Sequence, residues 1–426
     1  MDGRRVRTLP PAELAYRLRL SPLLRRLARI ARPTTLYLTG GALRDRLLGI
    51  STADLDLVVE DDAETVARRL GEALGGTVVP LGTPPAVTWR LAGRRWHVDI
   101  LGIPRGELRR DVTRRDFTVN AILWRLPAGP LVDLTGGLDD LAAGRLAAID
   151  PGNFHDDPLR VLRGLRLVAT RPMLSLTAEA ERHLAAARHG LGRVAAERIT
   201  AELRLLLGGP GVRRALRIAW RIGVLGVLHP SWRGVEECDQ LLAVAGRLAE
   251  LAARPGFLRR GAEEAALAVL AAPAAGFPHT WDAAAAEGAL SAIGFPERIA
   301  RQAAQAAALG ELLNPRLGTD APGSRTLAAR HLRVLPAALA WAVARRGEGK
   351  HDARTLLRWA RGFARRPPLL RGDEVARVLS LPPGPALAGA VRALQEARAR
   401  GEVRSGRQAR RWLEQLVDPA TKPLLE

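Results

Sequence analysis

Residues 36–56 read LYLTGGALRDRLLGISTADLD, and this stretch decides the fold of the N-terminal part of the chain. A short apolar run leads into Gly40-Gly41 and a helical stretch, and a second apolar run, DLDLVV, begins with Asp54 and Asp56. Alternate residues of a strand point to the same face, so the two carboxylates are expected to project together. Two neighbouring carboxylates favour a cation between them, and their hard oxygens suit Mg²⁺. The stretch therefore predicts a metal-dependent site that acts on phosphate.

The double glycine lies between the first expected strand and a helix that carries Arg44. Because Gly40 and Gly41 have no side chains, backbone N–H groups can approach a phosphate closely, and the helix N-terminus adds a favourable partial charge. Arg44 is placed to reach the same phosphates. By itself the pattern also fits a tight strand-to-helix turn with a surface Arg–Asp pair. Its closeness to Asp54 and Asp56 favours the phosphate site.

Two later blocks add candidates. A two-metal site usually needs a third carboxylate on a neighbouring strand, and Asp99 lies in an apolar segment where an unpaired charge is costly. The alternative is a strand-end aspartate that faces water. The second block places charges and an amide before an apolar strand, which suits the binding of phosphate and ribose, although a salt-bridged strand entry has the same composition. Its proposed members are Arg114, Arg115, Asp116 and Asn120.

A helical block further along carries Asp157, Arg160, Arg163 and Arg166 at intervals of three residues, so these side chains share one slowly drifting helix face. Pro158 fits the first turn of this helix, with Asp157 as its N-cap. In an ordinary amphipathic helix such residues pair with one another. An aspartate also accepts a hydrogen bond from an exocyclic amino group, and an arginine donates to ring nitrogen or carbonyl oxygen. Together they can select C or A over U and G.

The composition indicates a globular protein with a polyanionic partner. A chain of 426 residues is expected to form two to four domains. Only two of its 65 basic residues are lysines, which fits a GC-rich genome, but the net charge of +21 favours nucleic acid as the partner. The single cysteine, Cys238, excludes an intrachain disulfide and fits a reducing cytoplasm. No apolar run approaches the roughly 18 residues that a membrane span needs.

Strand signals concentrate between residues 34 and 126, and helical spacing dominates after Asp157, so an α+β head on a helical remainder is expected. A helix is predicted over Ala63–Leu74. The expected strands are Leu36–Thr39, Leu55–Val59, Thr77–Pro80, Val87–Leu91, Trp96–Leu101 and Ala121–Leu126. The predicted parts are a basic helical lead-in interrupted by Pro22 (1–33), the head (34–150), a neck (151–210), a body (211–320) and a tail (321–426).

The succession GGALRD, DLDLVV, RRDFTVNAI, GGLDDL, DDPLRVLRGLR and AAERITAELRLLL resembles the class II tRNA nucleotidyltransferase and bacterial poly(A) polymerase family. These motifs cover roughly residues 36–208, about 40% of the chain. The resemblance implies a small, polymerase-β-like nucleotidyltransferase head with a mixed sheet, followed by an all-helical neck, body and tail. It also implies Mg²⁺ as cofactor, CTP or ATP as substrate and the tRNA 3′ end as acceptor.

The resemblance assigns a role to each motif. Asp54 and Asp56 match the metal-binding pair, and Asp99 falls where the family has a third carboxylate. Gly41 and Arg44 match nucleotide-phosphate contacts, within a turn to which Gly40 belongs. The block of Arg114, Arg115 and Asp116 matches the ribose and triphosphate motif. Asp157 and Arg160 match the residues that template the incoming base, with Arg163 and Arg166 nearby.

One departure concerns the product. Only 14 residues separate Asp99 from Arg114, where members that complete CCA usually carry a longer flexible loop. The short form resembles members that add only C residues, which need a second nucleotidyltransferase to finish the end. Full CCA addition, poly(A) synthesis and a catalytically silent RNA-binding homologue remain the alternatives. His351-Asp352 resembles a phosphohydrolase dipeptide but lacks suitable partner histidines.

Overall fold

The computed structural model describes residues 18–52, 54–82, 87–94, 96–236, 238–317 and 322–416. Most of the predicted lead-in and Ala53 lie outside this part. The described chain divides into two compact units. The first unit extends to Val194 and includes Ile222–Val224, whereas the second takes Ala195–Arg221 and everything from Leu225 onward. The finer division into neck, body and tail remains a prediction.

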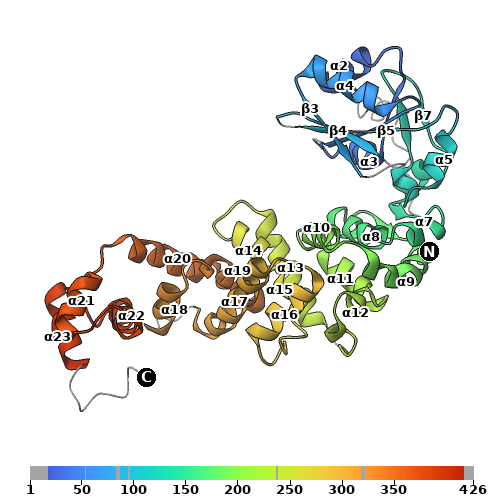
Figure 1. Cartoon of the computed structure of the whole chain (residues 1–426). Coiled ribbons are helices and arrows are strands. Elements are labelled where there is room, and N and C mark those ends of the chain that lie inside the picture. The colour runs from blue at the N-terminus through green and yellow to red at the C-terminus, as the bar shows by residue number, and fades with distance from the viewer. Residues whose placement is uncertain are drawn as a thin grey trace. The chain divides into compact units, whose positions relative to one another are not determined.

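The first unit is built on a seven-stranded mixed sheet with the order β3-β4-β5-β2-β1-β6-β7 (Figure 1). The central pair, β2 and β5, is parallel, and the other neighbours are antiparallel. All six predicted strands are present, and β7 is an addition. The strands are β1 (Leu36–Thr39), β2 (Asp54–Val59), β3 (Thr77–Leu81), β4 (Thr88–Ala92), β5 (His97–Gly102), β6 (Leu123–Arg125) and β7 (Leu131–Val132).

The two faces of the sheet differ in chemistry because alternate residues of β2 differ. Leu55, Leu57 and Val59 are buried, and α4 (Ala63–Leu74) packs across β3, β4 and β5. Helix α4 has the predicted bounds because Asp62 caps its start and Gly75 ends it with a φ of 69°. Figure 1 shows α2 (Pro22–Ile30) next to α4. The predicted interruption of the lead-in at Pro22 agrees with the described residues, because α2 begins there behind the cap Ser21 and residues 19–21 are not helical.

The other face carries the carboxylates and a small apolar cluster. Tyr37, Val58 and Leu123 form this cluster with Val112 of α5 (Leu108–Thr113) and Ala121. Val112 is fully buried there, so α5 is anchored against the same face that carries Asp54 and Asp56. The cluster fixes the segment that follows β5.

The rest of the first unit is helical apart from one short pairing. Strand β8 (Arg145–Leu146) runs parallel to β9 (Ser175–Leu176), which the sequence did not predict because two-residue strands carry almost no periodicity. The helices are α3 (Gly40–Leu47), η1 (Thr118–Asn120), α6 (Gly137–Ala142), α7 (Gly152–Asp156), α8 (Leu159–Thr170), α9 (Ala178–Ala187) and η2 (Arg188–Arg193).

All regular elements in the described part of the second unit are helices. Its helices are α10 (Ala196–Leu207), α11 (Val212–Arg221), α12 (Val224–Leu228), η3 (Pro230–Trp232), α13 (Asp239–Ala253), α14 (Arg259–Ala265), α15 (Ala268–Ala271), α16 (Ala283–Ile293), α17 (Glu297–Leu313), η4 (Asn314–Arg316), α18 (Pro322–Arg330), α19 (Leu335–Arg346), α20 (Lys350–Arg365), α21 (Gly372–Leu379), α22 (Pro385–Arg400) and α23 (Gly406–Leu416). Helices α14 and α15 are separate, and the amides of Val269 and Leu270 bond to carbonyls three residues back, which tightens the turn between them. None of the described helices has the length and apolar character required to cross a membrane.

Candidate active site

A row of polar side chains crosses four neighbouring strands on the carboxylate face. Asp56 of β2 is the register partner of Thr39 on β1 and of Asp99 on β5. Asp99 is in turn the partner of Arg90 on β4. Register partners in a sheet project on the same side, so these four side chains form one line. The structure thus brings Asp99 next to the carboxylate pair, as the sequence predicted.

Asp54 lies at the open end of this face. Its side chain is 80% exposed, and its Oδ1 atom is 3.4 Å from Nδ1 of His97, the residue paired with it on β5. Asp56, two residues further, is partly buried. Burial raises the pKa of the Asp56 carboxyl, and the negative charge of Asp99 adds to this rise, while a hydrogen bond from the Ala42 amide and the charges of Arg115 and Arg163 oppose it. A cation at this face relieves that cost.

Asp99 already has a positively charged partner. Arg90 donates from Nε to Oδ1 at 2.7 Å and from Nη2 to Oδ2 at 2.8 Å, which is a bidentate pair. Among the described residues, no three acidic, histidine or cysteine side chains converge closely enough to hold a metal ion. The donor chemistry of Asp54 and Asp56 nevertheless fits a hard divalent cation, because one carboxylate is accessible and the other is partly desolvated beside a second negative charge.

The Gly40-Gly41 turn presses against Asp56. Gly40 has a φ of 64°, and a Cβ atom built there would lie 2.6 Å from Oδ2 of Asp56. Only glycine combines this backbone conformation with such an approach. Helix α3 begins at Gly40, directly after β1, so its N-terminal amides lie beside the carboxylate pair. The predicted sequence of strand, double glycine and helix is confirmed.

Arg44 is buried beneath this turn, with 5% of the residue exposed. Its Nε and Nη2 atoms donate to Oδ1 of Asp45, and its Nη1 donates to Oδ1 of Asn120 at 2.7 Å. The nearest atom to a Cβ built on Gly41 is Arg44 Nη2, at 3.4 Å. The guanidinium therefore supports the turn from below, and its contact with the nucleotide phosphates stays a prediction.

The block from Arg114 to Asn120 is divided between surface and interior. Arg114 is exposed, whereas Arg115 pairs with Asp111 at 2.6 Å and donates to the carbonyl of Asn120. Asp116 is 3% exposed and accepts from Asn120 Nδ2 at 2.8 Å. Burial alone would raise the pKa of Asp116, but the charge of Arg163 and hydrogen bonds from Asn120 and the Phe117 amide lower it. Asp116 is therefore an ionised support.

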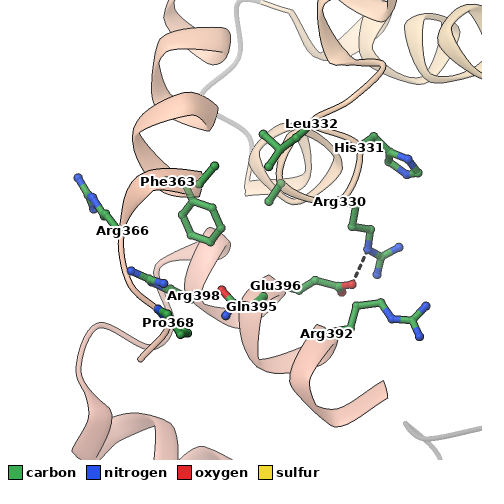
Figure 2. Close-up of a pocket in the computed structure, with 12 residues that line it drawn as sticks. Arg330, His331, Leu332, Phe363, Arg366, Pro368, Arg392, Gln395, Glu396 and Arg398 are labelled. Atoms are coloured by element: carbon green, nitrogen blue, oxygen red, sulfur yellow. Dashed lines mark hydrogen bonds and ion pairs between the residues drawn. The ribbon is translucent and has the colours of Figure 1, made fainter. Parts of the chain in front are cut away.

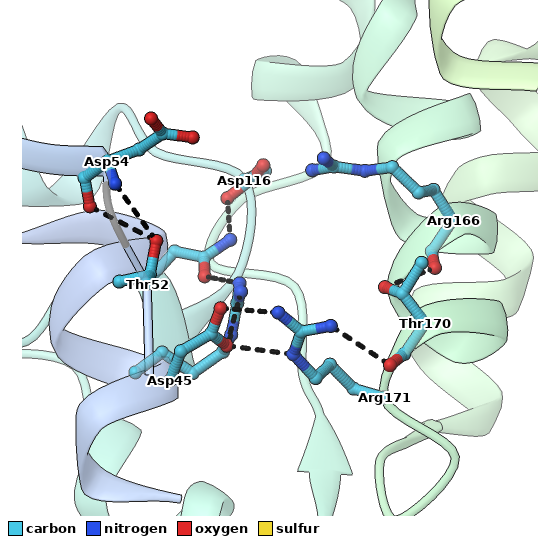
Figure 3. A network of polar contacts seen from close by, with 9 residues as sticks. Asp45, Thr52, Asp54, Asp116, Arg166, Thr170 and Arg171 are labelled. Carbon is cyan, nitrogen blue, oxygen red and sulfur yellow. Dashed lines mark hydrogen bonds and ion pairs between the residues drawn. The ribbon is translucent and has the colours of Figure 1, made fainter. Parts of the chain in front are cut away.

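Helix α8 brings the base-selecting candidates to the same region of the first unit. Arg163 Nη2 lies 3.2 Å from Oδ2 of Asp116, and Figure 3 shows the Arg166 side chain directed toward Asp116. Arg160 Nη1 donates to the carbonyls of Arg114 and Asn153, while its Nε is 3.9 Å from Asp157 Oδ2. These contacts confirm the shared face for the three arginines. Asp157 was expected to be the N-cap of this helix, but it is extended and lies one residue before the observed N-cap, Pro158.

Three supporting residues were not identified from the sequence. Arg90 forms an ion pair with Asp99. Asn153 donates hydrogen bonds to the carbonyls of Thr113 and Arg115 at 2.8 Å. Arg171 forms an ion pair with Asp45. Each contact joins residues that are distant along the chain or that depend on strand register. A periodicity argument contains no signal for such pairs.

The second unit contains a separate, basic cavity of about 720 Å³ formed by α18, α20 and α22 with the turns that follow α18 and α20. Figure 2 shows Arg398 near Phe363, and Arg330 and Arg392 on the side of Glu396, the acidic member, with Arg366 as the fourth arginine of the lining. Nearby, α20 carries exposed arginines at positions 354, 358, 361 and 365, which line a second hollow with Phe257. Spacings of four, three and four residues place these arginines on one helix face.

The chain is similar to known proteins over nearly its whole length. The model of the poly A polymerase head domain matches residues 36–90 and 87–147. An A-adding tRNA nucleotidyltransferase of Deinococcus radiodurans is 32% identical over 90% of this chain and 96% of that protein. A CC-adding tRNA nucleotidyltransferase of Geobacter sulfurreducens is 30% identical over 90% and 93%. Among solved structures, the CCA-adding enzyme of Bacillus stearothermophilus in complex with CTP has a TM-score of 0.72 at 21% identity, covering 95% of this chain and 100% of that one.

A head sheet with this carboxylate row and glycine turn, together with these relatives, defines an enzyme that transfers nucleotides. The chain belongs to the class II tRNA nucleotidyltransferase family, to which the poly A polymerase head also belongs. The predicted family and the predicted enzyme class are confirmed.

Proposed function

We propose that this enzyme adds C residues from CTP to the 3′ end of tRNA, without a nucleic-acid template, and stops before A. The observation that carries the proposal is the segment between Asp99 and Arg114. It forms a tight turn and the helix α5, the amide of Gly106 donates to Glu60 Oε1 at 2.7 Å, and Val112 is fully buried. A segment anchored in this way cannot make a large movement. In the family, the longer flexible loop is linked to the switch from C to A addition, so this segment is not expected to support that switch.

The chemistry we propose follows from the carboxylate row. Asp54 and Asp56 would hold Mg²⁺, with Asp99 joining them by exchanging Arg90 for the ion. Bound there, Mg²⁺ supplies positive charge that acidifies the primer hydroxyl and neutralises the triphosphate during displacement of pyrophosphate. The N-terminal amides of α3 at Gly40-Gly41 receive the phosphates, and Arg44 holds that turn from beneath.

Base choice is assigned to the partly exposed arginine face of α8 and to Asp157, which precedes the helix. Asp157 accepts from the exocyclic amino group of cytosine and Arg160 donates to its ring, with Arg163 and Arg166 supporting the same face. Arg114 and Arg115 carry the ribose and triphosphate side of the pocket, the first as an exposed contact and the second as a half-buried support with Asp116 and Asn120. The arginines of α20 and of the cavity around Phe363 bind the tRNA backbone.

A tRNA lacking its 3′ end tests this proposal. The substrate is offered each nucleoside triphosphate singly and then all together, and the products are sized. Two residues added from CTP, with no A added when ATP is present, is the expected result. Addition of A after the two C residues would show full CCA activity, and a long tail from ATP alone would show poly(A) polymerase activity. No Mg²⁺-dependent incorporation at all would indicate a silent RNA-binding homologue.

A-addition is the second candidate, because the Deinococcus radiodurans relative named for that activity aligns over 96% of its length. A tRNA that already ends in CC separates the two activities. Incorporation of one A into this substrate, with no C added to the shorter one, would establish A-addition. In either case a second nucleotidyltransferase supplies the missing part of the CCA end.

A further inference from the structure

We propose that Arg171 is a positioning residue that sets the distance between the phosphate-binding turn and the base-selecting helix. The inference rests on the proposed function, because it assigns Gly40-Gly41 to the phosphates and α8 to the base. Arg171 follows the last residue of α8 and leaves helical geometry, with a φ of −128°. Figure 3 shows its side chain reaching from this helix end to Asp45.

The contact between Arg171 and Asp45 is a buried bidentate pair. Arg171 Nε donates to Asp45 Oδ1 at 2.9 Å and Nη2 donates to Oδ2 at 2.5 Å. The Asp45 side chain is 7% exposed. Burial alone would raise the pKa of Asp45, but the hydrogen bonds and charges of Arg171 and Arg44 lower it. The aspartate is therefore charged, and it needs both arginines to remain so in the interior.

Asp45 connects Arg171 to the turn through Arg44. The same Oδ1 atom accepts from Arg171 and from Arg44, so the two guanidinium groups share one oxygen. Arg44 lies beneath Gly41 and donates onward to Asn120, which in turn donates to Asp116. A displacement of Arg171 therefore moves the support of the turn.

The last contact of this network returns to α8. Asp116 is 3.2 Å from Arg163, eight residues before Arg171 on the same helix segment. At 1.5 Å per residue, Arg163 lies about 10 Å along α8 from its last residue, Thr170, and Arg171 follows directly. The helix is thus fixed at two points by two buried aspartates, which are themselves joined through Asn120 and Arg44. Two anchors fix both the distance and the tilt of the helix, whereas one anchor leaves it free to pivot.

The test compares Arg171→Met with Arg345→Met. Arg345 is a matched control, because it pairs with Glu311 in the second unit and its side chain is 23% exposed, against 22% for Arg171. Steady-state addition of C and of U is measured at saturating tRNA while the nucleotide concentration is varied. Arg171→Met should lower kcat/KM for CTP by about 10- to 100-fold, because small misplacements of a binding group have effects of this size. It should also reduce the preference for CTP over UTP.

Three further measurements separate positioning from simple stability. Arg171→Lys keeps the charge without the planar fork and should recover only part of the activity. The double variant Asp45→Asn, Arg171→Met should be no worse than the poorer single variant, because the two residues act as a unit. Thermal unfolding identifies any variant that is not folded at the assay temperature, and Arg171→Lys then replaces Arg171→Met in the comparison.

Unchanged CTP kinetics and unchanged selectivity in a folded Arg171 variant would overturn the inference, as would full additivity with Asp45→Asn. A wild-type enzyme that adds no nucleotide to tRNA would instead contradict the proposed function. The two failures are therefore distinguishable in one experiment.

Discussion

Asp56 on β2 and Asp99 on β5 are register partners on adjacent parallel strands, and Arg90 on β4 is the partner of Asp99 on its other side. Asp99 therefore lies between the negative charge of Asp56 and the bidentate guanidinium of Arg90. This relationship makes Arg90 a competitor for the ligand that the proposed metal site needs.

Replacing Arg90 should change the metal requirement. Arg90→Met releases Asp99, so the Mg²⁺ concentration for half-maximal nucleotide addition should fall several-fold, by about 1 kcal/mol of binding free energy for a partly exposed pair. Titrations of activity with Mg²⁺ measure this. Arg68→Met, which removes an arginine from the α4 side of the sheet, is the control. If Arg90→Met and Asp99→Asn both leave the titration unchanged, Asp99 is not a ligand.

Asp56 should cost stability at neutral pH. Its pKa is raised above the ordinary value of 3.8, so the folded state binds a proton more readily than the unfolded state. The contribution of the Asp56 carboxyl to the free energy of unfolding is fully present below pH 3.8. It is lost as the pH rises through the pKa of the folded state. Asp56→Asn should therefore raise Tm at pH 7 without divalent cation, by about 2–4 °C for each kcal/mol relieved, and the gain should vanish in acid.

Asp56→Asn should also abolish nucleotide addition while tRNA binding is retained. Asp54→Ala should have both of these effects as well. Gel-shift and incorporation assays on the same preparations check both properties. Normal turnover in Asp54→Ala would refute the metal assignment.

Gly40 and Gly75 provide a matched pair of left-handed glycines. Both have positive φ, 64° and 69°, but only at Gly40 would a Cβ atom meet a carboxylate. Each substitution by alanine should cost about 1–2 kcal/mol of backbone strain. Gly40→Ala should in addition displace Asp56 and remove activity, whereas Gly75→Ala should remain active. Equal activity of the two variants would show that the turn has no role in catalysis.

The arginine face of α20 should account for part of the salt dependence of tRNA binding. Loss of each phosphate contact reduces the slope of log K against log salt by about 1. Arg358→Ala with Arg361→Ala should weaken binding and flatten this slope, and Arg68→Ala with Arg69→Ala in the first unit is the comparison. An unchanged slope in the α20 variant would exclude this face.

The sequence predicted the local elements well because their signals are local. Alternation predicted β2, and the predicted bounds of α4 hold because Asp62 caps its start and Gly75 ends it. The placement of Asp99 beside Asp56 also followed, since both lie in apolar strands. The partners of buried charges were not predictable, because Arg90 depends on strand register and Arg171 meets Asp45 from 126 residues away. The burial of Arg44 was not predicted for the same reason. An arginine at this spacing from the glycines can equally well lie at the surface and contact a phosphate.

Helix α5 is held by Val112 in the apolar cluster, whereas the turn before it is held at Ile103 and Gly106 by single hydrogen bonds from their amides. Residues inserted into that turn would leave the helix, the carboxylate row and the buried network in place. Under the proposed role of this turn, product length could change without any change in the catalytic residues, by gain or loss of a few codons at one position. Such a modular arrangement would let related enzymes with the same head differ in the tRNA end that they make.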